Sequence, residues 1–205
     1  MSEIKTIELT KENLTALHSE FEIIEPGVIK AIKTEKIPED DTNSLVMING
    51  LTFQNAIIEY DFMSKLTPDA PSHARGFIGI GFRINENASE FEGFYVRPTN
   101  GKGCEDAFRK SHGCQYFAYP GYIWNYFREF GINDYEAPVS TIELGTWSHV
   151  RAEIIDDTAK FYVDGNLVLS LDGNFVHKPS KGKFGFNTHI GTEAYFKNLT
   201  IEVLD

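Results

Sequence analysis

Hydrophobic and polar residues alternate with a period of two along much of the chain. In Ala56–Met63, Ile58 and Tyr60 share one face of an extended segment, and Glu59 and Asp61 share the other. Such alternation is typical of strands with one buried and one solvated face. The same pattern returns in further segments, which are Gly76–Ile84, Gly93–Pro98, Thr146–Ile155, Ala159–Val163, Asn166–Leu171, Lys183–Asn187 and Ala194–Leu204. The pattern therefore predicts a chain folded mainly into strands.

Turn sequences separate these segments. Asp156-Asp157 and Asp164-Gly165 predict tight turns, and Asn49-Gly50 predicts a hairpin after the apolar run Ser44–Ile48. No alternation of strands with helices is seen, and no internal repeat or linker. The sequence therefore predicts an all-β fold, an antiparallel two-sheet β-sandwich of the jelly-roll type.

The first 43 residues carry a different pattern. Leu14, Leu17 and Phe21 have helical spacing, which predicts a short helix over Lys11–His18. We expect residues 1–43 to join the sandwich, so that residues 1–205 form a single domain.

The alternation also predicts which side chains lie between the sheets. We expect burial of Ile58, Tyr60, Ile78, Ile80, Phe82, Phe94, Val96, Phe161 and Val163. Arg83, Tyr95 and Arg97 then point away from the core, beside a flat floor made by Gly79 and Gly81. Outward-pointing cations and a tyrosine on one face are a first indication of a site.

The net charge of -11 narrows the range of partners. Nucleic acid is excluded because its phosphates require a basic footprint, and an anionic membrane surface is excluded for the same reason. A neutral partner such as a glycan is compatible with this charge. The start of the chain has no apolar signal-peptide region, so we expect a cytoplasmic protein in which Cys104 and Cys114 are free thiols.

Candidate chemistry concentrates between Gly93 and Glu136. No other part of the sequence mixes so many aromatic rings with cations, amides and a carboxylate. Tyr122, Trp124 and Tyr126 are spaced by two, which in an extended segment places three rings on one face. We expect Trp124 to face a ligand and the two tyrosines to pack. Arginine and glutamine donate to hydroxyl groups, so the stretch favours a sugar-facing site.

Several motifs together resemble the concanavalin A-like lectin/glucanase superfamily. They are Phe77–Arg83, Phe94–Pro98, Gln115-Tyr116, Trp124, and the closing segments Gly182–Gly185 and Phe196–Ile201. The nearest resemblance is to bacterial laminin G-like domains and to the 3-keto-disaccharide hydrolase group. It covers roughly Leu45 to the C-terminus. It implies two stacked antiparallel sheets, one of them concave, with carbohydrate handled on the concave side.

Glu59 and Asp61 resemble part of the glucanase signature Glu-x-Asp-x-x-Glu. In that family the first glutamate is the nucleophile and the last is the acid/base, but the last position here is Ser64. Retaining hydrolysis needs both carboxyl groups. We therefore interpret Glu59 and Asp61 as solvated charges on a strand.

The candidate site follows from these observations. The ligand-binding candidates are Arg83, Tyr95, Arg97, Gln115, Trp124 and Arg128, and the candidate catalytic groups at the rim are His112 and Glu136. The alternative for Arg83 or Arg97 is a structural ion pair with Glu59 or Asp61 on the surface of the sandwich.

Three functions stay open at this point. The first is a lectin-like carbohydrate-binding domain, the second a glycoside hydrolase-like enzyme of the 3-keto-disaccharide type, and the third a laminin G-like protein-interaction domain. No cofactor is expected, although the resemblance allows a structural calcium ion. The oligomeric state is left open.

Overall fold

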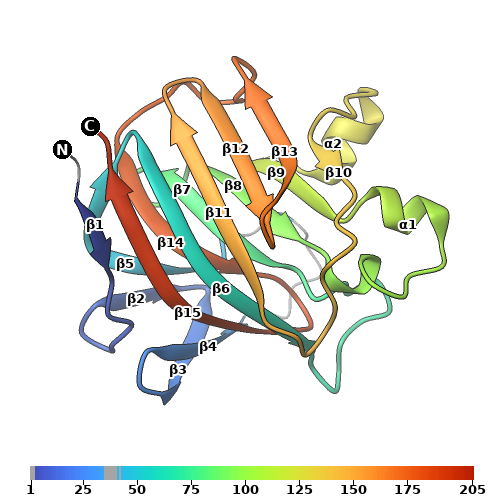
Figure 1. Cartoon of the computed structure of the whole chain (residues 1–205), viewed down its shortest axis with the longest axis horizontal. Helices are drawn as coiled ribbons and strands as arrows, with labels where there is room; N and C mark the ends of the chain where they lie inside the picture. Colours follow the sequence, from blue (N-terminus) through green and yellow to red (C-terminus); the bar gives the residue numbers. More distant parts are fainter. Residues whose placement is uncertain (1–2, 35–40, 42) are drawn as a thin grey trace.

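The chain folds into two antiparallel sheets that pack face to face, as a computed structural model covering residues 3–34, 41 and 43–205 shows (Figure 1). The predicted β-sandwich is confirmed. The eight-stranded sheet contains, in spatial order, β13 (Asn166–Asp172), β12 (Thr158–Val163), β11 (Ser148–Ile155), β6 (Ala56–Leu66), β15 (Thr192–Val203), β4 (Val28–Lys33) and β3 (Ser19–Glu25), while β1 (Ile4–Thr6) pairs with β15.

The seven-stranded sheet forms the second layer. Its spatial order is β10 (Glu136–Ala137), β9 (Cys114–Tyr119), β8 (Phe91–Val96), β7 (Ile78–Ile84), β14 (Gly182–Thr188), β5 (Leu45–Phe53) and β2 (Leu14–Leu17). The 3-10 helix η1 (Pro98–Asn100) follows β8, and two short helices, α1 (Ala107–Ser111) and α2 (Trp124–Glu129), flank β9 in sequence. Figure 1 shows both α-helices beside β9 and β10, at the far edge of the molecule from the two termini.

The core between the sheets is rich in aromatic rings. Every residue predicted to be buried there is buried in the main hydrophobic cluster. Phe94 of the seven-stranded sheet stacks on Phe161 of the other sheet with centroids 4.2 Å apart, and Phe186 stacks on Phe196 at 4.1 Å. Such ring pairs contribute about 0.5–1.5 kcal/mol beyond the area they bury. These pairs help to fix how the two sheets lie on each other.

The predicted helix over Lys11–His18 is wrong, because this segment contains the strand β2. Leu14 belongs to the core between the sheets, whereas Leu17 packs against a second cluster on the outer face of the seven-stranded sheet. Residues three apart in a strand point to opposite faces. The spacing that resembled a helix therefore reflects two hydrophobic layers on either side of one strand.

Two of the three predicted turns are confirmed. Asp156 and Asp164-Gly165 have positive φ angles and join β11 to β12 and β12 to β13. Asn49-Gly50 lies inside β5 instead, with φ of +72° at Gly50. The pairing of β5 with β14 passes from Met47 directly to Thr52, so this sequence makes a bulge rather than a hairpin.

The flat floor predicted at Gly79 and Gly81 is occupied by the protein itself. A Cβ atom at Gly79 would collide with the backbone of Phe94 and Tyr95, and one at Gly81 would meet Leu45 and Phe91. The outer face of this sheet is therefore partly covered by its own hydrophobic cluster. What stays open lies toward β8, β9 and β10.

Candidate functional site

The open part of the outer face lies where β8, β9 and β10 end beside the two helices. Tyr95 faces outward from β8, as the alternation predicts, and Arg97 follows directly after the strand. Gln115 of β9 pairs with Tyr95 on one side and with Glu136 of β10 on the other. The three strands thus bring residues separated by 41 positions, from Tyr95 to Glu136, into one row.

Glu136 is the centre of an ionic cluster. Arg128 donates to both carboxylate oxygens, from Nε to Oε2 at 3.0 Å and from Nη2 to Oε1 at 2.7 Å. Arg97 Nη2 lies 3.0 Å from Oε1. The Glu136 side chain is only 6% exposed, as is that of Arg97. Charge-assisted bidentate bonds of this kind are strong and fix geometry, so Glu136 holds two guanidinium groups in place.

A second set of hydrogen bonds ties this cluster to the sheet. The Tyr95 hydroxyl donates to Gln115 Oε1 at 2.7 Å and accepts from Arg97 Nη2 at 2.8 Å, and Arg97 also donates to Gln115 Oε1. Burial raises the pKa of Tyr95, so its hydroxyl stays protonated and can donate. Gln115 is fully buried, and its Nε2 has no hydrogen-bond partner in the described part of the chain.

His112 joins the cluster from the end of α1. Its Nδ1 lies 2.5 Å from the carbonyl oxygen of Phe108, which can only accept, so Nδ1 carries the hydrogen. Its Nε2 then points to Glu136 Oε2 at 3.5 Å. The two candidate catalytic groups of the sequence, His112 and Glu136, therefore lie together in the structure.

Trp124 and Arg128 are one turn apart on α2, so the predicted extended segment at Tyr122–Tyr126 is wrong. The real spacing is helical, with Phe127 buried and Trp124 36% exposed. The Arg128 guanidinium lies between two rings, 5.2 Å from the Trp124 centroid and 5.3 Å from that of Phe108. Tyr122 and Tyr126 pack against the core, as expected for these two residues.

These residues border a cavity of about 350 Å³, which we call the arginine cavity. Four arginines, two histidines, three aromatic rings and an amide line it: Arg75, Arg97, Arg109, Arg128, His73, His112, Phe77, Phe108, Trp124 and Asn100. Its volume lies within the range of about 300–1,000 Å³ that is common for small-molecule sites.

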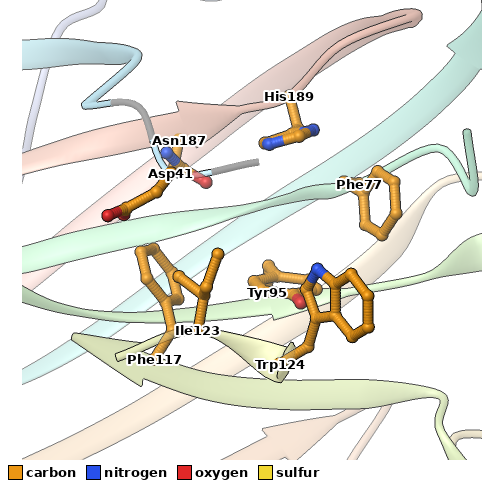
Figure 2. Close-up of a pocket in the computed structure, with 8 residues that line it drawn as sticks. All are labelled: Asp41, Phe77, Tyr95, Phe117, Ile123, Trp124, Asn187 and His189. Atoms are coloured by element: carbon orange, nitrogen blue, oxygen red, sulfur yellow. The ribbon is translucent and has the colours of Figure 1, made fainter. Parts of the chain in front are cut away.

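A smaller and more apolar pocket of about 40 Å³ adjoins it, with Phe77 and Trp124 shared between the two. Figure 2 shows Trp124 close to Tyr95, with Phe77 and His189 across from them and Asp41 at the far end. Burial raises the pKa of Asp41, whose carboxylate accepts from the Gly121 backbone N–H at 2.7 Å. This pocket has room for a ligand substituent but not for a whole sugar ring.

Arg83 is not part of the site, so this prediction is wrong. Its φ of +52° breaks the alternation of β7. The guanidinium donates to the carbonyl oxygens of Gln54 and Asp156, at 3.0 Å and 2.6 Å, and lies 5.0 Å from the Phe175 centroid. The preceding Phe82 is buried in the core as predicted. Arg83 therefore closes one end of the sandwich.

Glu59 and Asp61 lie on the outer face of the other sheet, as solvated charges. His149 lies between them, with Nδ1 2.8 Å from Asp61 and Nε2 3.1 Å from Glu59, and Arg151 also donates to Glu59. The interpretation as strand charges is confirmed, although their partners are His149 and Arg151 rather than Arg83 or Arg97.

The described residues were compared with the arrangements that bind metal ions in proteins. No three histidine, cysteine, aspartate or glutamate side chains there are arranged to hold a metal ion. Cys104 and Cys114 are buried free thiols, and burial raises the pKa of Cys114 to about 12. None of the helices in the described ranges is long and apolar enough to cross a membrane.

Arg75, Arg109, Phe108 and His73 line the cavity but are missing from the sequence-based candidates. Arg75 and His73 lie in the loop before β7, and the other two lie on α1, a helix that the alternation did not indicate. Their position depends on how a loop and a short helix fold over the sheet. The only signal in the sequence is the density of cations close to the predicted aromatic stretch.

Solved structures share this fold at low identity. Carbohydrate-binding module CBM66 from Bacillus subtilis is 18% identical, with a TM-score of 0.60 over 93% of this chain and 95% of that one. A protein from Parabacteroides distasonis, for which glycosyl hydrolysis has been suggested, is 15% identical with a TM-score of 0.57 over 98% of this chain and 100% of that one. A Bacillus subtilis protein of unknown function with a galectin-like fold is 11% identical with a TM-score of 0.58, over 98% of both chains.

Comparison with curated proteins finds no match. The sequence itself, however, matches one family along almost its whole length. The matched region, residues 7–202, contains the motifs of the outer face and every strand of the sandwich except β1 and the last residue of β15. The chain belongs to the 3-keto-alpha-glucoside-1,2-lyase-like domain family.

Proposed function

We propose that this protein binds carbohydrate in the arginine cavity. The observation that carries the proposal is the lining of that cavity, which combines partly exposed ring faces with fixed hydrogen-bond donors. Trp124 and Phe108 are 36% and 61% exposed, and the Arg128 donors lie between them. A pyranose offers an apolar C–H face to such rings and hydroxyl oxygens to such donors.

The donors are held in position before any ligand arrives. Arg97 and Arg128 are oriented by Glu136, and Arg109 is oriented by Asn100 and Thr99. A preorganised site avoids part of the entropy cost of ordering long side chains on binding. The relation in fold to a carbohydrate-binding module supports the same function.

A second candidate is an enzyme of the lyase type, which the family match favours. Elimination across carbons 1 and 2 of a 3-keto-glucoside requires a base to remove the proton on carbon 2, next to the carbonyl group. His112 is the candidate base in the cavity. Glu136 is a poorer candidate, because both of its oxygens accept hydrogen bonds from Arg128. None of the described residues that line the cavity has a carboxylate that could take the role of the base instead.

A glycan-array screen, followed by calorimetry on the best ligand, tests the binding function. Trp124→Ala should weaken binding about two- to tenfold, since one ring contact contributes about 0.5–1.5 kcal/mol. Trp147→Ala is the matched control, because Trp147 directly precedes β11 of the other sheet and its ring centroid lies 4.1 Å from Lys197 Nζ of β15. Equal affinity of Trp124→Ala and the wild type for every ligand would place the site elsewhere.

A product assay separates the binder from the enzyme. The ligand and its 3-keto derivative are incubated with the protein, and products are followed by mass spectrometry. We expect intact saccharide in both cases. Turnover of the 3-keto derivative that is lost in His112→Gln would establish the second candidate instead.

A further inference from the structure

Positively charged side chains dominate the lining of the arginine cavity. Four guanidinium groups line it, and none of the described residues in this lining carries a carboxylate. Glu136, which lies behind the lining, is shared by Arg97, Arg128 and His112. This concentration of cations occurs in a chain whose net charge is -11, so it does not follow from a generally basic surface.

Arg75 and Arg109 are the two arginines of the cavity that form no ion pair among the described residues. Arg75 donates from Nη1 to the carbonyl oxygens of Ser72 and Ala74, both at 2.8 Å. Arg109 donates from Nη2 to the carbonyl and hydroxyl oxygens of Thr99, both at 2.9 Å. Within the part of the chain that the structure describes, neither arginine has a carboxylate within 4.0 Å. Neutral acceptors therefore orient these two guanidinium groups, and no described carboxylate forms a direct ion pair with either of them.

The charges of Arg75 and Arg109 also act on each other. Burial lowers the pKa of Arg75, and the charges of Arg109 and Arg97 lower it further, while Cys104 and Asp106 act in the opposite direction without reversing the shift. Like charges gathered in a partly enclosed space repel each other, and an anion in the same space removes that cost. Both side chains are half-buried in the cavity lining, so an anion that enters can reach them.

We infer that the cavity selects acidic saccharides, that is, sugars that carry a carboxylate or a sulfate group. Arg75 and Arg109 bind the anionic group, and Trp124, Phe77 and Phe108 contact the sugar ring. The planar fork of a guanidinium matches the two oxygens of a carboxylate, and it also suits a sulfate. This inference rests on the proposed carbohydrate-binding function and specifies its ligand class.

The test compares each acidic oligosaccharide with a neutral counterpart of the same ring. Oligogalacturonates are measured beside their methyl esters, and sulfated glycosaminoglycan fragments beside their desulfated forms, by calorimetry at 50 mM and 300 mM salt. At least one acidic ligand should bind tenfold or more tightly than its neutral counterpart at low salt. The difference should shrink at high salt because the contact is ionic. The uronate and sulfate arms show which anionic group is preferred.

Arg75→Gln and Arg109→Gln should each lower the affinity for the acidic ligand much more than the affinity for its neutral counterpart, so that much of the acidic preference is lost. Arg151→Gln is the matched control, because it removes one arginine from the outer face of the other sheet. A melting curve confirms that each variant is folded. If Arg109→Gln fails to fold, Arg75→Gln and the wild-type comparison of acid with ester still decide the question.

Two results would overturn the inference while the proposed function stands. In one, acidic and neutral forms bind equally well, and Trp124→Ala weakens both. In the other, the acidic preference persists in both Arg75→Gln and Arg109→Gln, so that the charge is recognised elsewhere. Failure of every saccharide to bind would instead contradict the proposed function itself, and the inference with it.

Discussion

The outer faces of the two sheets both carry acidic and basic side chains, but they differ in how many carboxylates accompany the basic ones. On the eight-stranded sheet, His149 and Arg151 each contact two carboxylates, with Glu59 shared between them and Asp61 and Glu153 as the others. On the seven-stranded sheet, four arginines border one cavity, and no carboxylate is found among the described residues of its lining. Both faces are charged, but only one leaves positive charge for a ligand. Local charge balance therefore separates a candidate site from an ordinary solvated face.

Burial separates the two faces as well. The Glu136 side chain is 6% exposed, whereas that of Glu59 is 36% exposed, although each contacts arginine and histidine. Exposed ion pairs contribute little because water screens them, while the loss of one partner from a buried cluster leaves uncompensated charge. Loss of the carboxylate should therefore lower the free energy of unfolding several times more at Glu136 than at Glu59.

The strongest test of this comparison is a pair of matched substitutions. Glu136→Gln should lower the free energy of unfolding by about 3 kcal/mol, because it leaves two arginines without their shared carboxylate. Glu59→Gln makes the same change in net charge and should cost less than about 1 kcal/mol. Urea denaturation at pH 7 measures both. Equal losses in the two variants would mean that the Glu136 cluster is no more than another solvated network.

A smaller effect is expected from removing one hydroxyl group. Tyr95→Phe takes a donor from Gln115 and an acceptor from Arg97, so the free energy of unfolding should fall by about 1–2 kcal/mol. The control is Tyr162→Phe in β12, on the outer face of the other sheet, where a change within about 0.5 kcal/mol is expected. If both variants match the wild type in chemical denaturation, the row of hydrogen bonds across β8 and β9 does not support the site.

The smallest effect concerns pH on the eight-stranded sheet. Burial alone lowers the pKa of His149, but hydrogen bonds to Asp61 and Glu59 outweigh it, and the net shift is upward from 6.5. A raised folded-state pKa contributes stability that is present below pH 6.5 and is lost as the pH rises through the folded pKa. Because the side chain is 42% exposed, we expect less than about 1 kcal/mol.

Denaturation of the wild type and His149→Gln at pH 5.5 and pH 8.5 isolates this contribution. The wild type should lose more stability between the two values than the variant. Identical losses would show that the ion pairs of this face do not depend on the His149 charge.

Alternation along strands predicted the sandwich, its core and the outward positions of Tyr95 and Arg97, because side-chain direction follows directly from a regular backbone. It failed at Arg83, where a positive φ turns the side chain to the end of the sandwich. It also failed at Trp124, where the spacing is that of a helix. Arg75 and Arg109 could not be predicted in this way, since a loop and the helix α1 place them. The sequence thus indicated the site residues that the strands carry but not those that the loop and the helix carry.

The place of β15 in the eight-stranded sheet has a consequence for how the chain folds. This strand, the last of the described strands in sequence order, lies between β6 and β4 and also pairs with β1 (Figure 1). Its pairings join segments more than 120 residues apart, such as Thr192 with Leu66. Long loops must close before such contacts form, and chains rich in them fold slowly. The pairings of β7 with β8 and of β8 with β9, by contrast, join strands that are adjacent in sequence, so this part of the site can assemble before the pairings with β14 and within the other sheet are complete.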